Sequence, residues 1–217
     1  MTAPVWSPYE QGTVGWLKER CGCLTASRMA EAMDFLKGGK ESDKRRKLKI
    51  ELIAERMTDL MVSRYVNDAM QWGLDTEPAA RDRYEEITGT LVQRCGFALH
   101  GDIAFFGASP DGLIGDDGLI EIKCPTTTTY AEWVVAGAVP EQHQPQMLAQ
   151  LAVTRRRYVD FFAFDPRVKV ESHQHFLRRF EPKAEEIVKV EEAATKFLDE
   201  LDTLFHVVIE SGSGEAV

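Results

Sequence analysis

The chain of 217 residues is 44% hydrophobic and 28% charged, the composition of one ordinary globular domain, which excludes a disordered tail, a collagen-like fibre and a disulfide-stabilised miniprotein. Its net charge of −9 argues against a protein that coats nucleic acid non-specifically, but it allows nucleic acid to be held in one locally basic groove. No stretch approaches the roughly 20 apolar residues that span a bilayer. Nothing near the first residues is typical of a secretory signal, so we expect a cytoplasmic protein with no membrane contact and reduced cysteines.

The spacing of apolar residues predicts three helices in the first part of the chain. The first follows a cap at Thr25 or Ser27 and ends at the glycine pair 38–39. The second covers about 43–61 and the third about 76–87. This first part of the chain is therefore predicted to be helical.

The pattern then changes to short alternating segments separated by glycine-containing turns, which is typical of strands. A further helix is expected at 140–154, and a long amphipathic one starts near Pro182. These features predict a single mixed α/β domain over residues 1–210, followed by a flexible tail at 211–217. The expected strands are 91–99, 103–108, 119–123, 158–164 and 172–180.

Two acids and a lysine in the strand-rich part form the most informative pattern. Asp111 lies in the turn of Ser-Pro-Asp-Gly, and Glu121 and Lys123 follow on the next strand. Alternate residues of a strand share a face, so Glu121 and Lys123 point the same way, and a hairpin would bring Asp111 close to them. Mg²⁺ prefers such carboxylate oxygens, and a lysine beside the ion can orient or activate the attacking water. A surface Glu–Lys pair and a turn-stabilising Asp are the structural alternatives.

These residues resemble the PD-(D/E)xK nuclease superfamily and, more narrowly, the phage lambda exonuclease or YqaJ-like viral recombinase family. The resemblance extends in separate motifs from Trp16 to Arg167. The matching segments are Trp16 with Arg20, Leu24–Ser27, Trp72-Gly73 with Glu77, Ser109–Leu113, Glu121–Pro125, Val153–Arg155 and Phe164–Arg167.

The resemblance implies a restriction-endonuclease-like α/β fold, in which helices flank one central mixed sheet. It implies a Mg²⁺-dependent exonuclease that digests the 5′ strand of linear double-stranded DNA to 5′-mononucleotides and leaves a 3′ overhang. Two metal ions are expected, with Mn²⁺ able to substitute. The expected partners are DNA ends, two further copies of the chain in a ring-shaped homotrimer, and a single-strand annealing protein.

The family also implies roles for individual residues. Asp111, Glu121, Glu77 and the backbone carbonyl of Ile122 would bind metal, with Lys123 orienting the attacking water. A glutamine on the helix after the catalytic strands would help, and we assign it to Gln146, with Gln144 and Gln150 as alternatives one turn or less away.

A pocket for the 5′-phosphate is the second implied site. Arg20, Ser27 and Ser109 match the family's pocket, and a guanidinium with two hydroxyls suits phosphate oxygens. Ser27 is equally explained as a helix cap, and Trp16 we expect to be a core residue.

Basic runs and two other functions remain as alternatives. Residues 44–49 and 155–157 are basic and are candidates for a DNA channel, although such runs are usually solvated faces. An endonuclease of restriction or repair type would keep the fold and cut closed circles. A non-catalytic DNA-end-binding module would keep the fold without the chemistry, but the intact acid–acid–lysine set argues against it.

Overall fold

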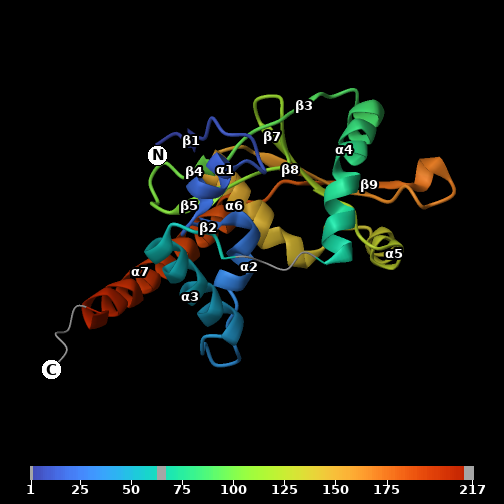
Figure 1. The fold of residues 1–217 in the computed structure, drawn as a ribbon. Helices are drawn as coiled ribbons and strands as arrows, with labels where there is room; N and C mark the ends of the chain where they lie inside the picture. Colours follow the sequence, from blue (N-terminus) through green and yellow to red (C-terminus); the bar gives the residue numbers. More distant parts are fainter. Residues whose placement is uncertain (1, 63–66, 213–217) are drawn as a thin grey trace.

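The computed structural model describes residues 2–62 and 67–212, which form two mixed β-sheets and the helices packed on them (Figure 1). The strands are β1 (Val5–Trp6), β2 (Leu24–Thr25), β3 (Val92–Gln93), β4 (Ala98–Leu99), β5 (Phe106–Ala108), β6 (Gly112–Ile114), β7 (Gly118–Lys123), β8 (Tyr158–Phe164) and β9 (His175–Phe180). The helices are α1 (Val14–Arg20), α2 (Met29–Ala32), α3 (Asp43–Thr58), α4 (Asp68–Thr88), α5 (Thr127–Ala136), α6 (Gln144–Thr154) and α7 (Ala184–Gly212). Three short 3-10 segments are η1 (Ala26–Arg28), η2 (Glu141–His143) and η3 (Glu171–His173).

Each sheet contains one parallel pair among antiparallel neighbours. The first sheet has the order β1-β4-β5-β2, and its parallel pair β2–β5 places Thr25 opposite Gly107. The second has the order β3-β6-β7-β8-β9, and its parallel pair β7–β8 runs from Gly118 opposite Tyr158 to Lys123 opposite Ala163. A parallel pair needs a long crossover connection, and here α5 and α6 provide it.

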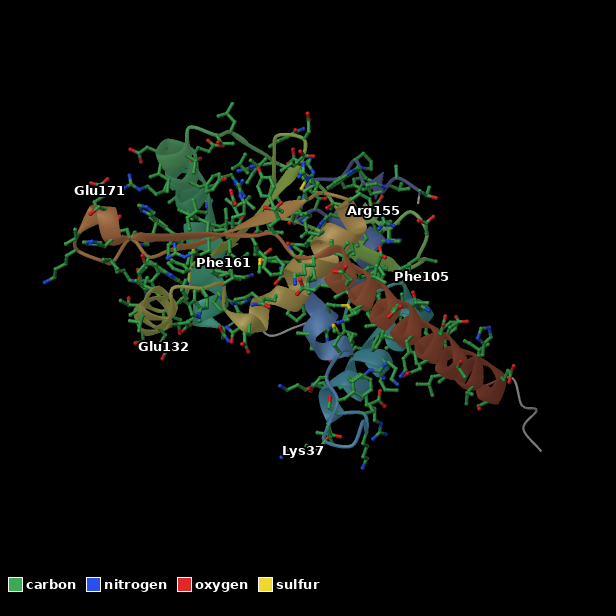
Figure 2. The ribbon with its side chains drawn as sticks, turned by 180° about the vertical axis from the view of Figure 1, so that it is seen from behind. Lys37, Phe105, Glu132, Arg155, Phe161 and Glu171 are labelled. Atoms are coloured by element: carbon green, nitrogen blue, oxygen red, sulfur yellow. The ribbon has the colours of Figure 1, made fainter. Side chains whose placement is uncertain are left out.

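The two faces of the second sheet carry separate hydrophobic cores. On one face Leu119 and Phe161 pack with residues of α5 and α6, and Figure 2 shows Phe161 within this interior. On the other face Ile120 and Phe162 pack with Tyr84 of α4. Because strand residues alternate between faces, Glu121 shares the face of Leu119 and points toward α6.

Helix α6 also belongs to a third core, shared with α3, α7 and the first sheet. Its residues Ala149, Ala152 and Val153 are fully buried there, while Met147 and Leu151 face the second sheet. Helix α7 packs along this core and then extends away from the body toward the C-terminus (Figure 1). Helix α6 therefore joins the two sheets. Within residues 2–62 and 67–212, no helix is long and apolar enough to cross a membrane.

Several predicted elements are confirmed. Strand β8 has the bounds expected from its apolar run, and α3 begins after Ser42, whose side chain accepts the Arg45 N–H at 3.1 Å. The α6 and α7 segments are helical as expected, and α4 ends before Gly89, which has a φ of 65°. The mixed α/β class is confirmed, whereas the single central sheet is wrong, because β5 and β6 belong to different sheets.

The helix expected up to residues 38–39 is wrong. The chain forms only η1 and the four-residue α2, and Thr25 makes no side-chain cap. Leu36 is 53% exposed, and a turn with positive φ at Gly38 and Gly39 returns the chain to a bridge between Phe35 and Glu41. Met29 and Ala32 face a core, but Met33 and Leu36 are exposed, so the second half of the apolar pattern has no packing that would continue the helix.

Other boundaries also differ from the sequence expectations. The expected strand 91–99 is two strands, β3 and β4, in different sheets, while β6 and α5 were not expected. Helix α4 starts at Asp68 and carries Pro78 in its interior, although proline prefers the first turn. Ser211 and Gly212 belong to α7 instead of a tail, and the remainder of that tail, 213–217, lies outside the described residues.

Candidate active site

Asp111, Glu121 and Lys123 come together where the chain passes from the first sheet into the hairpin β6–β7 of the second. Gly112 lies opposite Ile120, and a Cβ at Gly112 would meet Val92 Cγ1 at 2.1 Å, so only glycine allows this approach. Oδ2 of Asp111 accepts the Ile122 N–H at 2.6 Å, and Nζ of Lys123 lies 2.5 Å from Oε1 of Glu121. The arrangement expected from strand alternation is therefore present in space.

Two glutamines of α6 hold the Glu121 carboxylate. Nε2 of Gln146 donates to Oε1 at 2.7 Å, and Nε2 of Gln150 donates to Oε2 at 2.6 Å. The two residues are four apart, which places them on one face of the helix. Gln144 instead donates to the Val139 carbonyl at 3.4 Å. Among the three glutamines left open by the sequence, two contact the site, and Gln150 is the contact that our assignment to Gln146 missed.

The site concentrates negative charge at Asp111. Burial, together with the charges of Glu121 and Glu77, raises the pKa of the Asp111 carboxyl well above its usual range. Burial alone would lower the pKa of Lys123, but Glu121 and Asp111 outweigh it and raise that pKa, so the ammonium stays charged. A cation placed beside Asp111 would favour its ionised form, which is the electrostatic condition for a metal site.

The donor set suits Mg²⁺, but it is not yet arranged around a metal. Within the described parts of the chain, no three His, Cys, Asp or Glu side chains gather closely enough to hold an ion. Glu121 accepts from Gln146, Gln150 and Lys123, and Oε1 of Glu77 accepts from Arg81 at 2.6 Å. Carboxylates and a backbone carbonyl match the preference of Mg²⁺ for oxygen, so the chemistry of these donors fits the ion.

Arg20, at the end of α1, lies beside Ser109, which follows β5. Its Nη1 donates to Oγ of Ser109 at 2.8 Å, and Nε1 of Trp16 donates to the same oxygen at 3.0 Å. The guanidinium also lies over the Trp16 ring, 4.2 Å from its centroid. Burial lowers the pKa of Arg20 to about 10, so it keeps its charge at neutral pH. Of the two roles open for Trp16 in the sequence, core packing and support of Arg20, the contacts favour the second, because Trp16 is half-buried and its ring lies against Arg20.

Ser27 lies near the same end of the first sheet. The parallel pairing of Thr25 with Gly107 brings the segments that follow β2 and β5 side by side, and these segments carry Ser27 and Ser109. Ser27 is exposed, and its Oγ is 3.2 Å from Oγ1 of Thr25. An exposed hydroxyl at this position remains available to an incoming phosphate.

A cleft of about 800 Å³ opens beside Asp111. Its walls are the N-terminal segment 6–12, helix α4 with Glu77 and Arg81, and the loop 93–96. Trp16 also lines it. Gln11 fastens the N-terminal wall, because its Nε2 donates to the carbonyls of Pro110 at 2.7 Å and Cys95 at 3.1 Å. Sequence reasoning missed Gln11 and Arg81, although the spacing of Arg81 four residues after Glu77 was a readable signal for a helical pair.

The basic runs considered for DNA binding are largely occupied by structural contacts. Arg45 and Lys49 are buried, and both pair with Glu41 and Glu200. The two interpretations left open for the run 44–49, a DNA channel and a solvated helix start, are both wrong for these two residues, which attach α3 to α7. In the second run, the members pair with acids or donate to backbone carbonyls: Arg155 with Glu191, Arg157 with Asp117, and Arg156 with the carbonyls of Gly115 and Gly118.

Comparison with known proteins places this geometry in a family. The sequence profile described as the YqaJ-like viral recombinase domain matches residues 15–157. The chain belongs to the YqaJ-like viral recombinase family. The match includes the acid cluster and Arg20, Ser27 and Ser109, whereas the cleft wall at 6–12 precedes it. A search of curated protein sequences finds no significant match.

Solved structures agree with this assignment. The chain is similar to LHK-Exo, an alkaline exonuclease from Laribacter hongkongensis, with 38% identity over 93% of this chain and 98% of that one. The TM-score is 0.86 for LHK-Exo in complex with dAMP and 0.85 for a second structure of that protein. A phage-related exonuclease from Haemophilus somnus 129PT has a TM-score of 0.60 at 14% identity over 83% of this chain and 95% of that chain, which shows a shared fold.

Proposed function

We propose that this YqaJ-like protein is a Mg²⁺-dependent exonuclease that digests the 5′ strand of linear double-stranded DNA to 5′-mononucleotides. The observation that carries the proposal is the continuity of the segment 109–111. Ser109 at its start contacts Arg20, and Asp111 at its end contacts the strand that carries Glu121 and Lys123. A phosphate-binding pair and an acid cluster are thus held at a fixed short separation. The similarity to an alkaline exonuclease with bound dAMP supports the same activity.

The residues of the chain would divide the reaction between them. Bound Mg²⁺, held by Asp111, Glu121, Glu77 and the Ile122 carbonyl, would supply charge neutralisation and water activation. Lys123 keeps its proton, so it acts as a hydrogen-bond donor that orients the nucleophilic water or a phosphate oxygen, and not as a base. Gln146 fixes Glu121 and presents its amide to the same space.

The direction of digestion would come from Arg20. A terminal 5′-phosphate carries more charge than an internal phosphodiester, and a buried guanidinium with two hydroxyls nearby favours the more highly charged group. Capture of that phosphate by Arg20, Ser27 and Ser109 would place the next phosphodiester beside Asp111. Cleavage there releases one 5′-mononucleotide and leaves a new 5′-phosphate for the following cycle.

Assembly and partners complete the proposal. We propose a ring-shaped homotrimer around DNA, and an annealing protein that takes over the 3′ overhang left by digestion. The acidic net charge of the chain is compatible with a ring that binds DNA only in its bore.

Purified protein with Mg²⁺ should be incubated with linear duplexes labelled at either end and with a closed circle. We expect loss of the 5′-phosphorylated strand, survival of its complement and an intact circle, with mononucleotides as product. Cutting of the circle would indicate an endonuclease instead. Binding of ends without digestion in Mg²⁺ or Mn²⁺ would indicate a non-catalytic end-binding module.

A further inference from the structure

Arg81 is a guanidinium in the cleft to which the proposed mechanism gives no role. It lies on α4 and lines the cleft together with Glu77 and Asp111. Its Nη2 donates to Oε1 of Glu77 at 2.6 Å and lies 3.4 Å from the Asp111 carbonyl oxygen. The side chain is 12% exposed and lines the cleft. A cation in this position is close to the acid cluster without belonging to it.

A comparison with Arg45 shows why Arg81 is available to a ligand. The Arg45 guanidinium is 2% exposed and bonds two carboxylates and a backbone carbonyl, those of Glu41, Glu200 and Ala32. Among the residues that the structure describes, Arg81 pairs with one carboxylate, that of Glu77, and its buried Nε has no partner. Arg45 is thus satisfied by the fold, whereas Arg81 retains hydrogen-bonding capacity beside a cleft.

The segment 109–111 places Arg81 relative to the 5′-phosphate pocket. Arg20 contacts residue 109 at one end, and Arg81 contacts residue 111 at the other. Two residues of extended chain span at most about 7 Å, so the two guanidiniums flank a short stretch of the site. Successive phosphates of one DNA strand would meet Arg20 first and Arg81 next.

We propose that Arg81 binds the internal phosphodiester that follows the 5′-terminal phosphate, and that Glu77 neutralises Arg81 when no DNA is present. This inference rests on the proposed exonuclease function. On DNA binding the phosphate replaces Glu77 as the partner of Arg81, which frees the Glu77 carboxylate to face a cation. The ligand chemistry is a phosphodiester oxygen, and a guanidinium can donate two hydrogen bonds to it.

DNA affinity without cleavage tests the proposal. Binding of a 5′-phosphorylated duplex is measured by fluorescence anisotropy in EDTA over a series of salt concentrations, for the wild type, Arg81→Gln and Arg81→Lys. Loss of charge-assisted hydrogen bonds should weaken binding by Arg81→Gln by about tenfold. The slope of log affinity against log salt should fall by about 1, because one phosphate contact is lost. Arg81→Lys keeps the charge and should retain most of the slope.

Arg83→Gln is the matched control. Arg83 lies on the same helix and has a buried Nε without a partner, as Arg81 does, but it pairs with the exposed Glu86 and Glu171 and does not line the cleft. It should bind DNA like the wild type. A loss of affinity and slope in Arg83→Gln equal to that in Arg81→Gln would overturn the proposal, because the effect would then follow from the charge of α4 as a whole.

A double variant separates a phosphate contact from simple repulsion by Glu77. Arg81→Gln leaves the negative charge of Glu77 uncompensated, so weaker DNA binding by this variant has two explanations, a lost phosphate contact and repulsion by Glu77. The double variant Glu77→Gln/Arg81→Gln removes that charge. If Arg81 binds phosphate, the double variant still lacks about one unit of salt slope. Recovery of wild-type affinity and slope by the double variant would show that the inference is wrong, even if the wild type digests DNA as proposed. Failure of the wild type itself to bind DNA would overturn the proposed function as well.

Discussion

The two sheets contribute different chemistry to the site. The first sheet, which is built from strands of two or three residues, carries the residues that we propose to bind phosphate: Arg20 before β2, Ser27 after it and Ser109 after β5. The second, in which β7 and β8 are longer strands buried on both faces, contributes Glu121 and Lys123 from β7. Only residues 109–111 connect β5 of one sheet to β6 of the other. Recognition and chemistry are therefore separable by mutation, although they are adjacent in space.

Asp111→Asn should produce the largest loss and should affect only the chemical step. Removal of one metal-binding carboxylate is expected to lower kcat by about 1,000-fold, the equivalent of several kcal/mol of transition-state stabilisation. DNA binding in EDTA should remain, because Arg20 and Ser109 are untouched. Single-turnover digestion and anisotropy measure the two quantities. Wild-type kcat in this variant would show that the acid cluster is not the catalytic site.

Arg20→Gln should give a smaller effect, on recognition of the DNA end and not on the chemical step. The preference for a 5′-phosphate over a 5′-hydroxyl end should fall by about tenfold, because a charge-assisted pair is lost. Cleavage of 5′-hydroxyl ends should change little, since the second sheet is intact. Competition between the two substrates gives the ratio directly. An unchanged ratio would place the 5′-phosphate elsewhere and remove the assignment of recognition to the first sheet.

Gln150→Leu should act through stability and positioning. It leaves Oε2 of Glu121 without its 2.6 Å donor in a buried site, which should cost about 1–3 kcal/mol of unfolding free energy. Gln146→Leu is the comparison, because Gln146 is less buried than Gln150. The two variants are measured by urea denaturation and by kcat. Equal stability of Gln150→Leu and the wild type would show that Gln146 and Lys123 suffice to hold Glu121.

The smallest expected effect is on the pH dependence of stability without metal. The folded-state pKa of Asp111 is raised above the unfolded value, so the protonated carboxyl favours folding at low pH. This contribution is complete below the ordinary carboxyl pKa, and it is lost as pH rises through the raised folded-state value. In EDTA, the Tm of the wild type should therefore fall relative to that of Asp111→Asn as pH increases across this window. A constant difference between the two proteins would show that Asp111 is not perturbed.

The sequence predicted those parts of the fold whose signals are local. Helix α3 follows from its cap and periodicity, and β8 from a continuous apolar run. Helix α5 was missed because it opens with threonines, which are weak helix formers, and it is stabilised by the burial of Tyr130 and Trp133. The strand expected at 91–99 is interrupted at Gly96, where a Cβ would meet the Tyr9 carbonyl oxygen at 2.5 Å. That contact joins segments far apart in the chain, so no local pattern could reveal it.

In the candidate site, too, the residues placed by local structure were predictable and those placed by long-range packing were not. Asp111, Glu121 and Lys123 were predictable together because hairpin pairing and strand alternation fix their relative positions. The choice among the three glutamines and the place of Arg81 in the cleft were not, because they depend on how α6 and α4 are rotated against the second sheet. The basic run at 44–49 was misleading for a related reason, since Glu200, which pairs with Arg45 and Lys49, lies far along the chain on α7.

The position of α6 against both sheets has a consequence for insertions and deletions. A helix turns by about 100° for each residue, so the loss or gain of one residue between α5 and α6 would carry both amides away from Glu121 if the helix kept its axis. The buried alanines on its other side oppose this rotation, because the glutamines would have to enter the apolar interface with α7. Length changes in this connection should therefore be tolerated poorly, whereas the exposed turn at Gly38 and Gly39 has room for them.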